Sequence, residues 1–218
     1  MIDLPLLIQQ CVPSIVQASM QAIIRVESNN NPLALNINKG YKLQFQPQSD
    51  GQANKWIKYL ENNHYNFDIG LAQVNIKNIH KYGYKAIDLL DPCTNLKLGS
   101  KILVENYNNA LPSSKSSDEA LQKAISAYNT GNFYTGFSNG YVNKVYTYAS
   151  KETLALNTNT DIPPISNNNI KPANPGVEHS AVSSTPVKTE LNPYSSRSLI
   201  YIQQKKNISS ELSGIRDI

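Results

Sequence analysis

Residues 13–28 read PSIVQASMQAIIRVES, a pattern typical of an amphipathic helix that ends on a carboxylate. Pro13-Ser14 predicts the start of this helix, with Ser14 as its N-cap, and the run Asn29–Pro32 predicts its end. Apolar residues follow each other at intervals of three and four, the period of one helix face: Ile15, Ala18, Ala22 and Val26. The pattern therefore places Glu27 at the C-terminal end of an apolar helix face.

A carboxylate in the position of Glu27 lies at the negative end of the helix dipole and beside apolar neighbours. Both conditions raise the pKa of a carboxyl group and favour its protonated form. An acid poised near neutral pH can protonate the oxygen of a leaving group. Taken alone, Glu27 is more typical of a solvated glutamate near a helix end than of a catalytic acid.

The rest of residues 1–152 reads mainly as helices, with a small sheet or irregular lobe over residues 65–74. The predicted fold class is α+β and predominantly helical. From residue 153 onward the composition changes to proline, asparagine and serine, so we expect residues 153–218 to be a mostly disordered tail. The helices are expected over residues 53–60, 96–107, 120–128 and 140–151.

Composition excludes several classes of protein for this chain of 218 residues. No apolar run is long enough for a membrane-spanning helix, and a net charge of +4 without a basic cluster argues against nucleic acid as a partner. Cys11 and Cys93 are the only cysteines and lack the spacing of a metal site, so we expect no metal and no cofactor. They are either two buried thiols or one disulfide of an exported protein, although no export signal is evident at the N-terminus.

Three later segments combine polar or aromatic side chains with glycine: DIGLAQVN (68–75), AYNTG (127–131) and GYVNKV (140–145). In the first, Gly70 permits close approach of a ligand to the backbone, and two amides lie on one side if the segment is extended. Each segment alone is also typical of a turn, a helix end or core packing. The candidate side chains are Gln73, Asn75, Tyr128, Asn129 and Tyr141.

In this order, the segments together with Glu27-Ser28 resemble the catalytic domain of lytic transglycosylases, relatives of goose-type lysozyme. The family pattern is Glu-Ser, Gly-Leu-Met-Gln-Ile-Asn, Ala-Tyr-Asn-x-Gly and Tyr-Val-x-x-Val, from which Ala72 and Val74 depart mildly. The resemblance covers roughly residues 10–150. It implies a lysozyme-like fold for residues 1–152 and cleavage of the β-1,4 bond between N-acetylmuramic acid and N-acetylglucosamine in peptidoglycan.

The compact size, the segment DPCTNL (91–96) and the Cys11/Cys93 pair look most like the small transglycosylases that accompany type IV secretion and conjugation systems. This resemblance implies a monomer in the periplasm or cell envelope, with glycan strands and components of a type IV secretion system as partners. The enzyme would open the cell wall locally for such an apparatus.

The resemblance also implies roles for single residues. Glu27 would act first as acid and then as base, closing the muramic acid 6-hydroxyl onto the anomeric carbon to give a 1,6-anhydro end. Gln73 would bind the sugar, Tyr128 would support the reacting region, and Ser28 would position Glu27 or the substrate. The remaining substrate-binding candidates are Asn75, Asn129, Tyr141 and Asp68.

Two alternatives stay open. Asp68 could serve as a second carboxylate, which would make the protein a hydrolytic muramidase, or the cleft could be a binding module that docks secretion components on the wall.

Outside the motifs, Trp56 and Tyr59 are equally typical of a sugar-stacking wall and of core packing. The scattered residues His64, His80 and His179 are not expected to carry catalysis, and Leu199–Ile202 is either a docking segment or unstructured.

Overall fold

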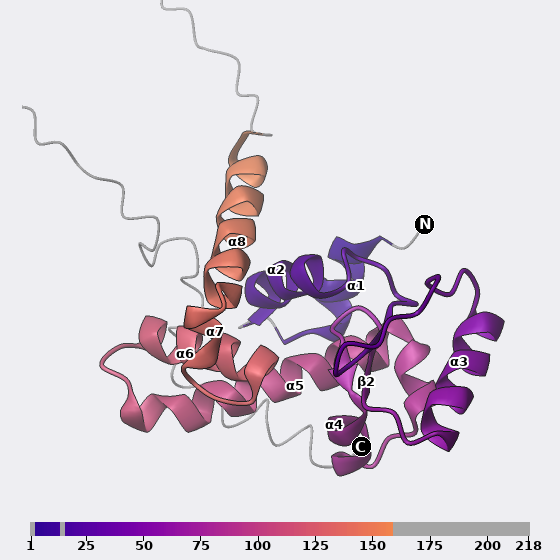
Figure 1. Ribbon diagram of the computed structural model, residues 1–218. Helices are drawn as coiled ribbons and strands as arrows, with labels where there is room; N and C mark the ends of the chain where they lie inside the picture. Colours follow the sequence, from indigo (N-terminus) through magenta and orange to yellow (C-terminus); the bar gives the residue numbers. More distant parts are fainter. Residues whose placement is uncertain (1–2, 14–15, 159–218) are drawn as a thin grey trace, which may run out of the picture.

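The computed structural model describes residues 3–13 and 16–158, with side chains described up to Lys151. A long central helix, α5, runs through the molecule, with helices on one side and a small sheet with its own helices on the other (Figure 1). The helices are α1 (Leu4–Cys11), α2 (Gln17–Glu27), α3 (Asp50–Asn62), α4 (Ile76–Lys81), α5 (Pro92–Ala110), α6 (Ser117–Thr130), α7 (Thr135–Ser138) and α8 (Tyr141–Thr158), and the 3-10 turns are η2 (Ala86–Leu90) and η3 (Leu111–Ser113).

The sheet has three short antiparallel strands in the order β1-β2-β3: β1 (Leu35–Ile37), β2 (Phe67–Ile69) and β3 (Val74–Asn75). Asn36 of β1 faces Asp68 of β2, and Asp68 in turn faces Asn75 of β3. Residues that lie 32 positions apart in the chain are thereby brought side by side. The segment between β1 and β2 contains α3, which forms the outer edge of this lobe (Figure 1).

Local signals explain where the principal helices begin and end. Asp91 caps α5 by accepting a hydrogen bond from the Thr94 amide at 2.8 Å, and Pro92 occupies the first turn, where its missing N–H costs nothing. Ser116 caps α6 in the same manner. Gly131 ends α6 in a left-handed conformation with φ 75°, which a glycine adopts without steric strain.

The predicted predominantly helical fold with a small sheet is confirmed, with differences at several element boundaries. Helix α1 and strand β1 were not predicted. Helix α2 begins at Gln17 after Val16, and Ser14, its predicted N-cap, lies outside the described residues. Helix α8 continues to Thr158, beyond the end expected near residue 151. Of the tail predicted over residues 153–218, residues 159–218, with His179 and Leu199–Ile202, lie outside the described part, and the boundary at residue 152 stays a prediction.

The buried face of α2 differs from the one predicted. Ala18 is exposed and Val26 only partly buried, whereas Met20, Ile23 and Ile24 are fully buried. The larger side chains remove more apolar area from water than the alanines can, and this decides the rotation of the helix. Val16, Met20, Ile23 and Glu27 consequently follow one line along α2, and the carboxyl group continues the buried face.

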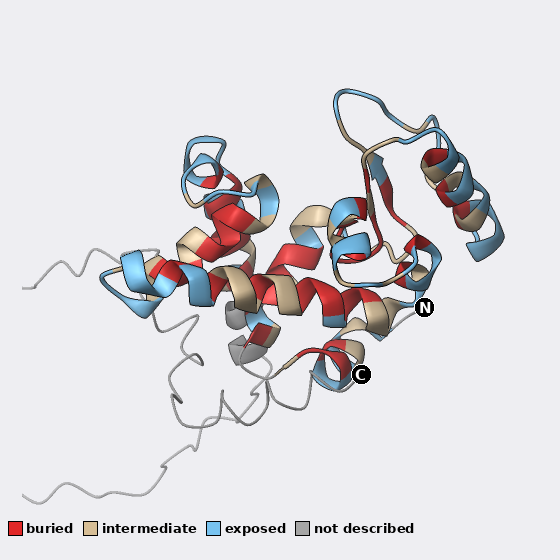
Figure 2. Cartoon of the chain, turned by 90° about the horizontal axis from the view of Figure 1, so that it is seen from below, coloured by how far each residue is buried: buried red, intermediate tan, exposed pale blue. Residues whose placement is uncertain are grey.

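The core lies where α2, α5, α6 and α8 pack together and beneath the sheet, as the buried segments in Figure 2 show. A disulfide between Cys11 and Cys93 joins the end of α1 to the first turn of α5. Of the two alternatives that the sequence left open, the structure therefore has the disulfide. In the part of the chain that the structure describes, no helix has the length and apolar character needed to cross a membrane.

Candidate active site

Glu27 is the last residue of α2, and its surroundings show why the helix ends there. The amide and the hydroxyl of Ser28 both donate to the Ile24 carbonyl, at 3.1 and 3.2 Å, which satisfies a carbonyl at the end of the helix. Asn29 and Asn30 then adopt positive φ angles of 51° and 66°, so the chain turns away from the helix axis. Ser28 thus holds the helix end that presents Glu27.

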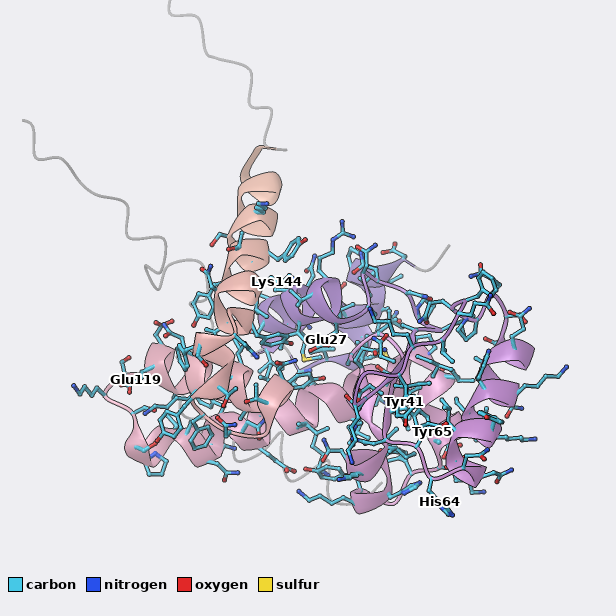
Figure 3. All side chains as sticks on the ribbon, in the orientation of Figure 1. Glu27, Tyr41, His64, Tyr65, Glu119 and Lys144 are labelled. Atoms are coloured by element: carbon cyan, nitrogen blue, oxygen red, sulfur yellow. A yellow bond between two sulfur atoms is a disulfide. The ribbon has the colours of Figure 1, made fainter. Side chains whose placement is uncertain are left out.

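Glu27 is half-buried, and its side chain lies at the end of α2, where it meets Tyr141 of α8 (Figure 3). Its pKa is raised from 4.5 to about 7: burial is the largest cause and the charge of Asp68 adds to it, while the hydrogen bond from Tyr141 and the charge of Lys144 oppose the rise. The Tyr141 hydroxyl donates to Oε1 of Glu27 at 2.5 Å. The site therefore holds a protonated carboxylic acid at a pH where an exposed glutamate is ionised.

Asp68 is a second carboxyl group near Glu27, and two amides hold it. Asn75 donates to Oδ1 at 2.7 Å and Asn38 to Oδ2 at 3.0 Å. Burial raises the pKa of Asp68, and both hydrogen bonds oppose that rise because they favour the ionised form. The Oδ1 atom of Asn75 also accepts from the Lys77 amide at the start of α4. Asn75 therefore binds Asp68 and caps a helix.

Gln73 is enclosed by the loop that connects β2 and β3. Its Nε2 donates to the carbonyls of Gly70 at 2.7 Å and Ala34 at 3.1 Å, and its Oε1 accepts from Asn36 at 2.7 Å. Its backbone has φ 46°, so the segment turns at Gln73 and is not extended as the sequence suggested. Gln73 and Asn75 therefore do not form one row of amides on a strand.

Asn95, to which sequence analysis gave no role, fixes the same loop from beneath. It is fully buried on α5; its Oδ1 accepts from the Ala72 amide at 2.8 Å, and its Nδ2 donates to the carbonyls of Ile69 at 2.8 Å and Leu89 at 3.0 Å. A Cβ at Gly70 would lie 2.3 Å from Nδ2 of Asn95, so only glycine fits there. The sequence signal that could have identified Asn95 is its position as an asparagine on an otherwise apolar helix face.

Tyr128 and Asn129 come from the end of α6. The Tyr128 hydroxyl donates to the Ala72 carbonyl at 2.8 Å. Burial and the charges of Glu27 and Asp68 raise the pKa of this phenol well above its usual value, so it stays protonated. Asn129 is exposed, and its Oδ1 accepts from Asn139 at 3.3 Å. Tyr128 therefore reaches the region of both carboxyl groups, while Asn129 lies at the surface.

The other polar residues singled out in the sequence lie elsewhere. His64 is exposed, and the exposed His80 is 3.5 Å from Glu61. Among residues 3–13 and 16–158, the structure has no group of three His, Cys, Asp or Glu side chains that could hold a metal ion. The described chemistry is thus concentrated at Glu27, Asp68 and the phenols that surround them.

The structure thus places a shielded acid at the end of a helix, near a small sheet that carries a second carboxyl group. Residues 8–150 match the family model described as the transglycosylase SLT domain, and the chain belongs to this family. It is accordingly a lytic transglycosylase, as the resemblance in its sequence implied.

Curated relatives agree with this family. The chain is 40% identical over 162 residues to the type IV secretion system protein virB1 of Brucella abortus (strain 2308), a match that covers 72% of this chain and 68% of the relative. It is 37% identical over 146 residues to the protein virB1 of Agrobacterium fabrum, covering 66% of this chain and 58% of that relative. No solved structure matches the chain.

Proposed function

We propose that this enzyme cleaves the β-1,4 bond between N-acetylmuramic acid and N-acetylglucosamine in peptidoglycan and leaves a 1,6-anhydromuramic end. The observation that carries the proposal is the environment of Glu27, whose burial raises the pKa to about 7 while Tyr141 holds Oε1 in place. An acid with this pKa can give up a proton and take one back at neutral pH, which one residue must do if it acts twice.

In the first step Glu27 donates its proton to the glycosidic oxygen, and the bond between that oxygen and the anomeric carbon breaks. The N-acetylglucosamine end leaves as an alcohol, and positive charge develops on the muramic acid ring. In the second step the Glu27 carboxylate removes the proton of the 6-hydroxyl while the oxygen of that hydroxyl bonds to the anomeric carbon. The proton lost by Glu27 is restored, and no water is consumed.

The neighbours of Glu27 suit each step. Tyr141 and Lys144 stabilise the carboxylate that exists between the two proton transfers, because both favour its charged form. Asp68, held by Asn38 and Asn75, places a second carboxyl group near Glu27, where its negative charge stabilises positive charge on the sugar. Gln73 and Tyr128 hold the loop between β2 and β3 at the geometry that the substrate meets.

Asp68 also supports the second candidate, a hydrolytic muramidase. In that reaction a second carboxylate acts as nucleophile or activates water. The two amides that bind the carboxylate of Asp68 favour its ionised form, as this role requires. Burial is the larger effect and raises the pKa of Asp68, so proton abstraction from water is also open to it.

The relatives named as type IV secretion system protein virB1 support a role in opening the cell wall for a secretion or conjugation apparatus. The disulfide between Cys11 and Cys93 fits the oxidising environment of a periplasm. We therefore infer that the enzyme acts in the cell envelope, with glycan strands as substrate and components of such an apparatus as partners.

Digestion of purified peptidoglycan with the wild type, Glu27→Gln and Asp68→Asn, followed by mass analysis of the released muropeptides, tests the proposal. We expect wild-type products that are lighter than hydrolysed products by one water, and no products from Glu27→Gln. Glu119→Gln, at an exposed position on α6 remote from the site chemistry, serves as the matched control and should retain activity.

The other outcomes separate the alternatives. Products with hydrolysed ends that disappear in Asp68→Asn would establish the muramidase. A wild-type protein that binds the wall without releasing any product would support the third alternative, a binding module that docks secretion components on the wall.

A further inference from the structure

Four aromatic side chains form a continuous row on the lobe that contains α3. We call this row the aromatic shelf; its members are Tyr41, Tyr65, Tyr59 and Trp56. The ring centroids of Tyr41 and Tyr65 lie 5.4 Å apart edge to face, those of Tyr59 and Tyr65 lie 6.3 Å apart in a stacked arrangement, and those of Trp56 and Tyr59 lie 5.8 Å apart edge to face. Figure 3 shows Tyr41 and Tyr65 next to each other near α3.

The shelf combines two anchored rings with two exposed ones. Trp56 and Tyr65 pack against the hydrophobic core, whereas Tyr41 and Tyr59 remain 57% and 51% exposed. The loop that carries Tyr41 is fixed to β1, because the Gln46 amide both accepts from the Leu35 amide and donates to the Leu35 carbonyl, each at 2.9 Å. The exposed rings are therefore held in place before any ligand arrives, which lowers the entropy cost of binding.

The composition of the shelf points to sugar as its ligand. The shelf consists of three tyrosines and a tryptophan. A surface for a protein partner could equally well be built from aliphatic side chains. Aromatic faces stack on the C–H face of a pyranose, and phenol hydroxyls and the indole N–H can bond its hydroxyl groups.

The surrounding charge suits the peptides of the wall. Residues 38–66 contain four lysines and two acidic residues, and all four lysines are exposed. Lys55 lies one helix turn before Tyr59 on α3, and Lys42 directly follows Tyr41. Within the described residues these lysines form no ion pair. They are available to the carboxylates that stem peptides carry.

The shelf is connected to the active site through the sheet. Tyr65 lies three residues before Asp68 on the way into β2, and Tyr41 follows β1, which carries Asn36. The strand β2 therefore leads back from Asp68 toward Tyr65, which lies two residues before the strand begins. A glycan strand that lies along the sheet can engage both.

We propose that the aromatic shelf is an accessory site that stacks on sugars of the same peptidoglycan strand, away from the bond that is cut. Its exposed lysines bind the carboxylates of neighbouring stem peptides. The inference rests on the proposed function, because the substrate class is taken from it.

Binding of non-cleaving protein to purified sacculi tests the shelf separately from catalysis. In the Glu27→Gln background, Tyr59→Ala should raise the apparent Kd by about threefold to tenfold, the range of one aromatic contact. Tyr41→Ala, on a different segment, should have a similar effect. Agreement between the two variants would show that the weaker binding does not come from a folding defect in one of them. Tyr134→Ala is the matched control, since Tyr134 is 71% exposed on the other lobe, and should leave Kd unchanged.

A second probe separates sugars from peptides. On glycan strands freed of stem peptides, the tyrosine variants should keep their defect, whereas Lys55→Gln should weaken binding only when the peptides are present. Unchanged Kd values for both tyrosine variants would overturn the inference and leave the shelf to a protein partner. Failure of the proposed function would instead appear as the wrong products in the digestion, and would leave these binding results as they are.

Discussion

Replacing Glu27 with glutamine should stabilise the folded protein, and by more as the pH rises. The folded state raises the pKa of Glu27 from 4.5 to about 7, so between these values the folded protein binds a proton that the unfolded chain has released. The resulting stability is complete below pH 4.5 and is lost as the pH rises through 7. Since one pKa unit corresponds to 1.36 kcal/mol, the ionised form costs about 3 kcal/mol at pH 8.

Glutamine stays neutral at every pH and can still accept the hydrogen bond of Tyr141. We therefore expect Glu27→Gln and wild type to have nearly equal free energies of unfolding at pH 4, and to differ by about 3 kcal/mol at pH 8. Urea unfolding at intervals of one pH unit, with the disulfide intact, measures this difference.

Glu119→Gln serves as the control, because the pKa of that exposed carboxyl is lowered by its hydrogen bond with Lys123. The free energy of unfolding of this variant should not rise relative to that of the wild type as the pH increases. A difference for Glu27→Gln that is the same at pH 4 and pH 8 would show that the carboxyl is not shielded, and would refute the reasoning from burial.

Three further changes should alter the site in distinct ways. Tyr141→Phe removes a hydrogen bond that lowers the pKa of Glu27, so the alkaline limb of the pH profile of kcat/KM should move upward by about one unit; a downward movement would contradict this. Asn38→Ala removes a donor that favours ionised Asp68, so the charge that raises the pKa of Glu27 weakens and the same limb should move downward. Asn95→Ala leaves three buried backbone groups unpaired and should lower the free energy of unfolding by about 3 kcal/mol in urea; a change under about 1 kcal/mol would show that the loop finds other partners.

Local patterns predicted the elements whose ends are determined by neighbouring residues. The helices expected over residues 96–107 and 120–128 are present as α5 and α6, whose ends at Asp91-Pro92 and Gly131 are determined by capping and local backbone conformation. The position of Glu27 at the end of α2 was predicted for the same reason, because Asn29–Pro32 ends the helix whatever packs against it. The acid of the site was therefore accessible from sequence.

The arrangement of the amides around the site could not be predicted from local sequence patterns. Asn38 and Asp68 are 30 positions apart, and Asn36 and Gln73 are 37 apart, so their hydrogen bonds exist only after β1 and β2 pair. Asparagine is also abundant throughout this chain, so no local pattern distinguishes the few that reach the site from those at the surface. The same long-range packing set the rotation of α2; periodicity alone predicted the buried Ala22 but missed the fully buried Met20, Ile23 and Ile24.

The hydrogen bond between Tyr141 and Glu27 joins residues 114 positions apart, and it requires α8 to lie against α2. A growing or translocating chain that has not yet delivered its final described helix has a glutamate in water, with the pKa of an ordinary carboxyl group. The shielded environment of Glu27 is thus complete only when α8 has packed against α2.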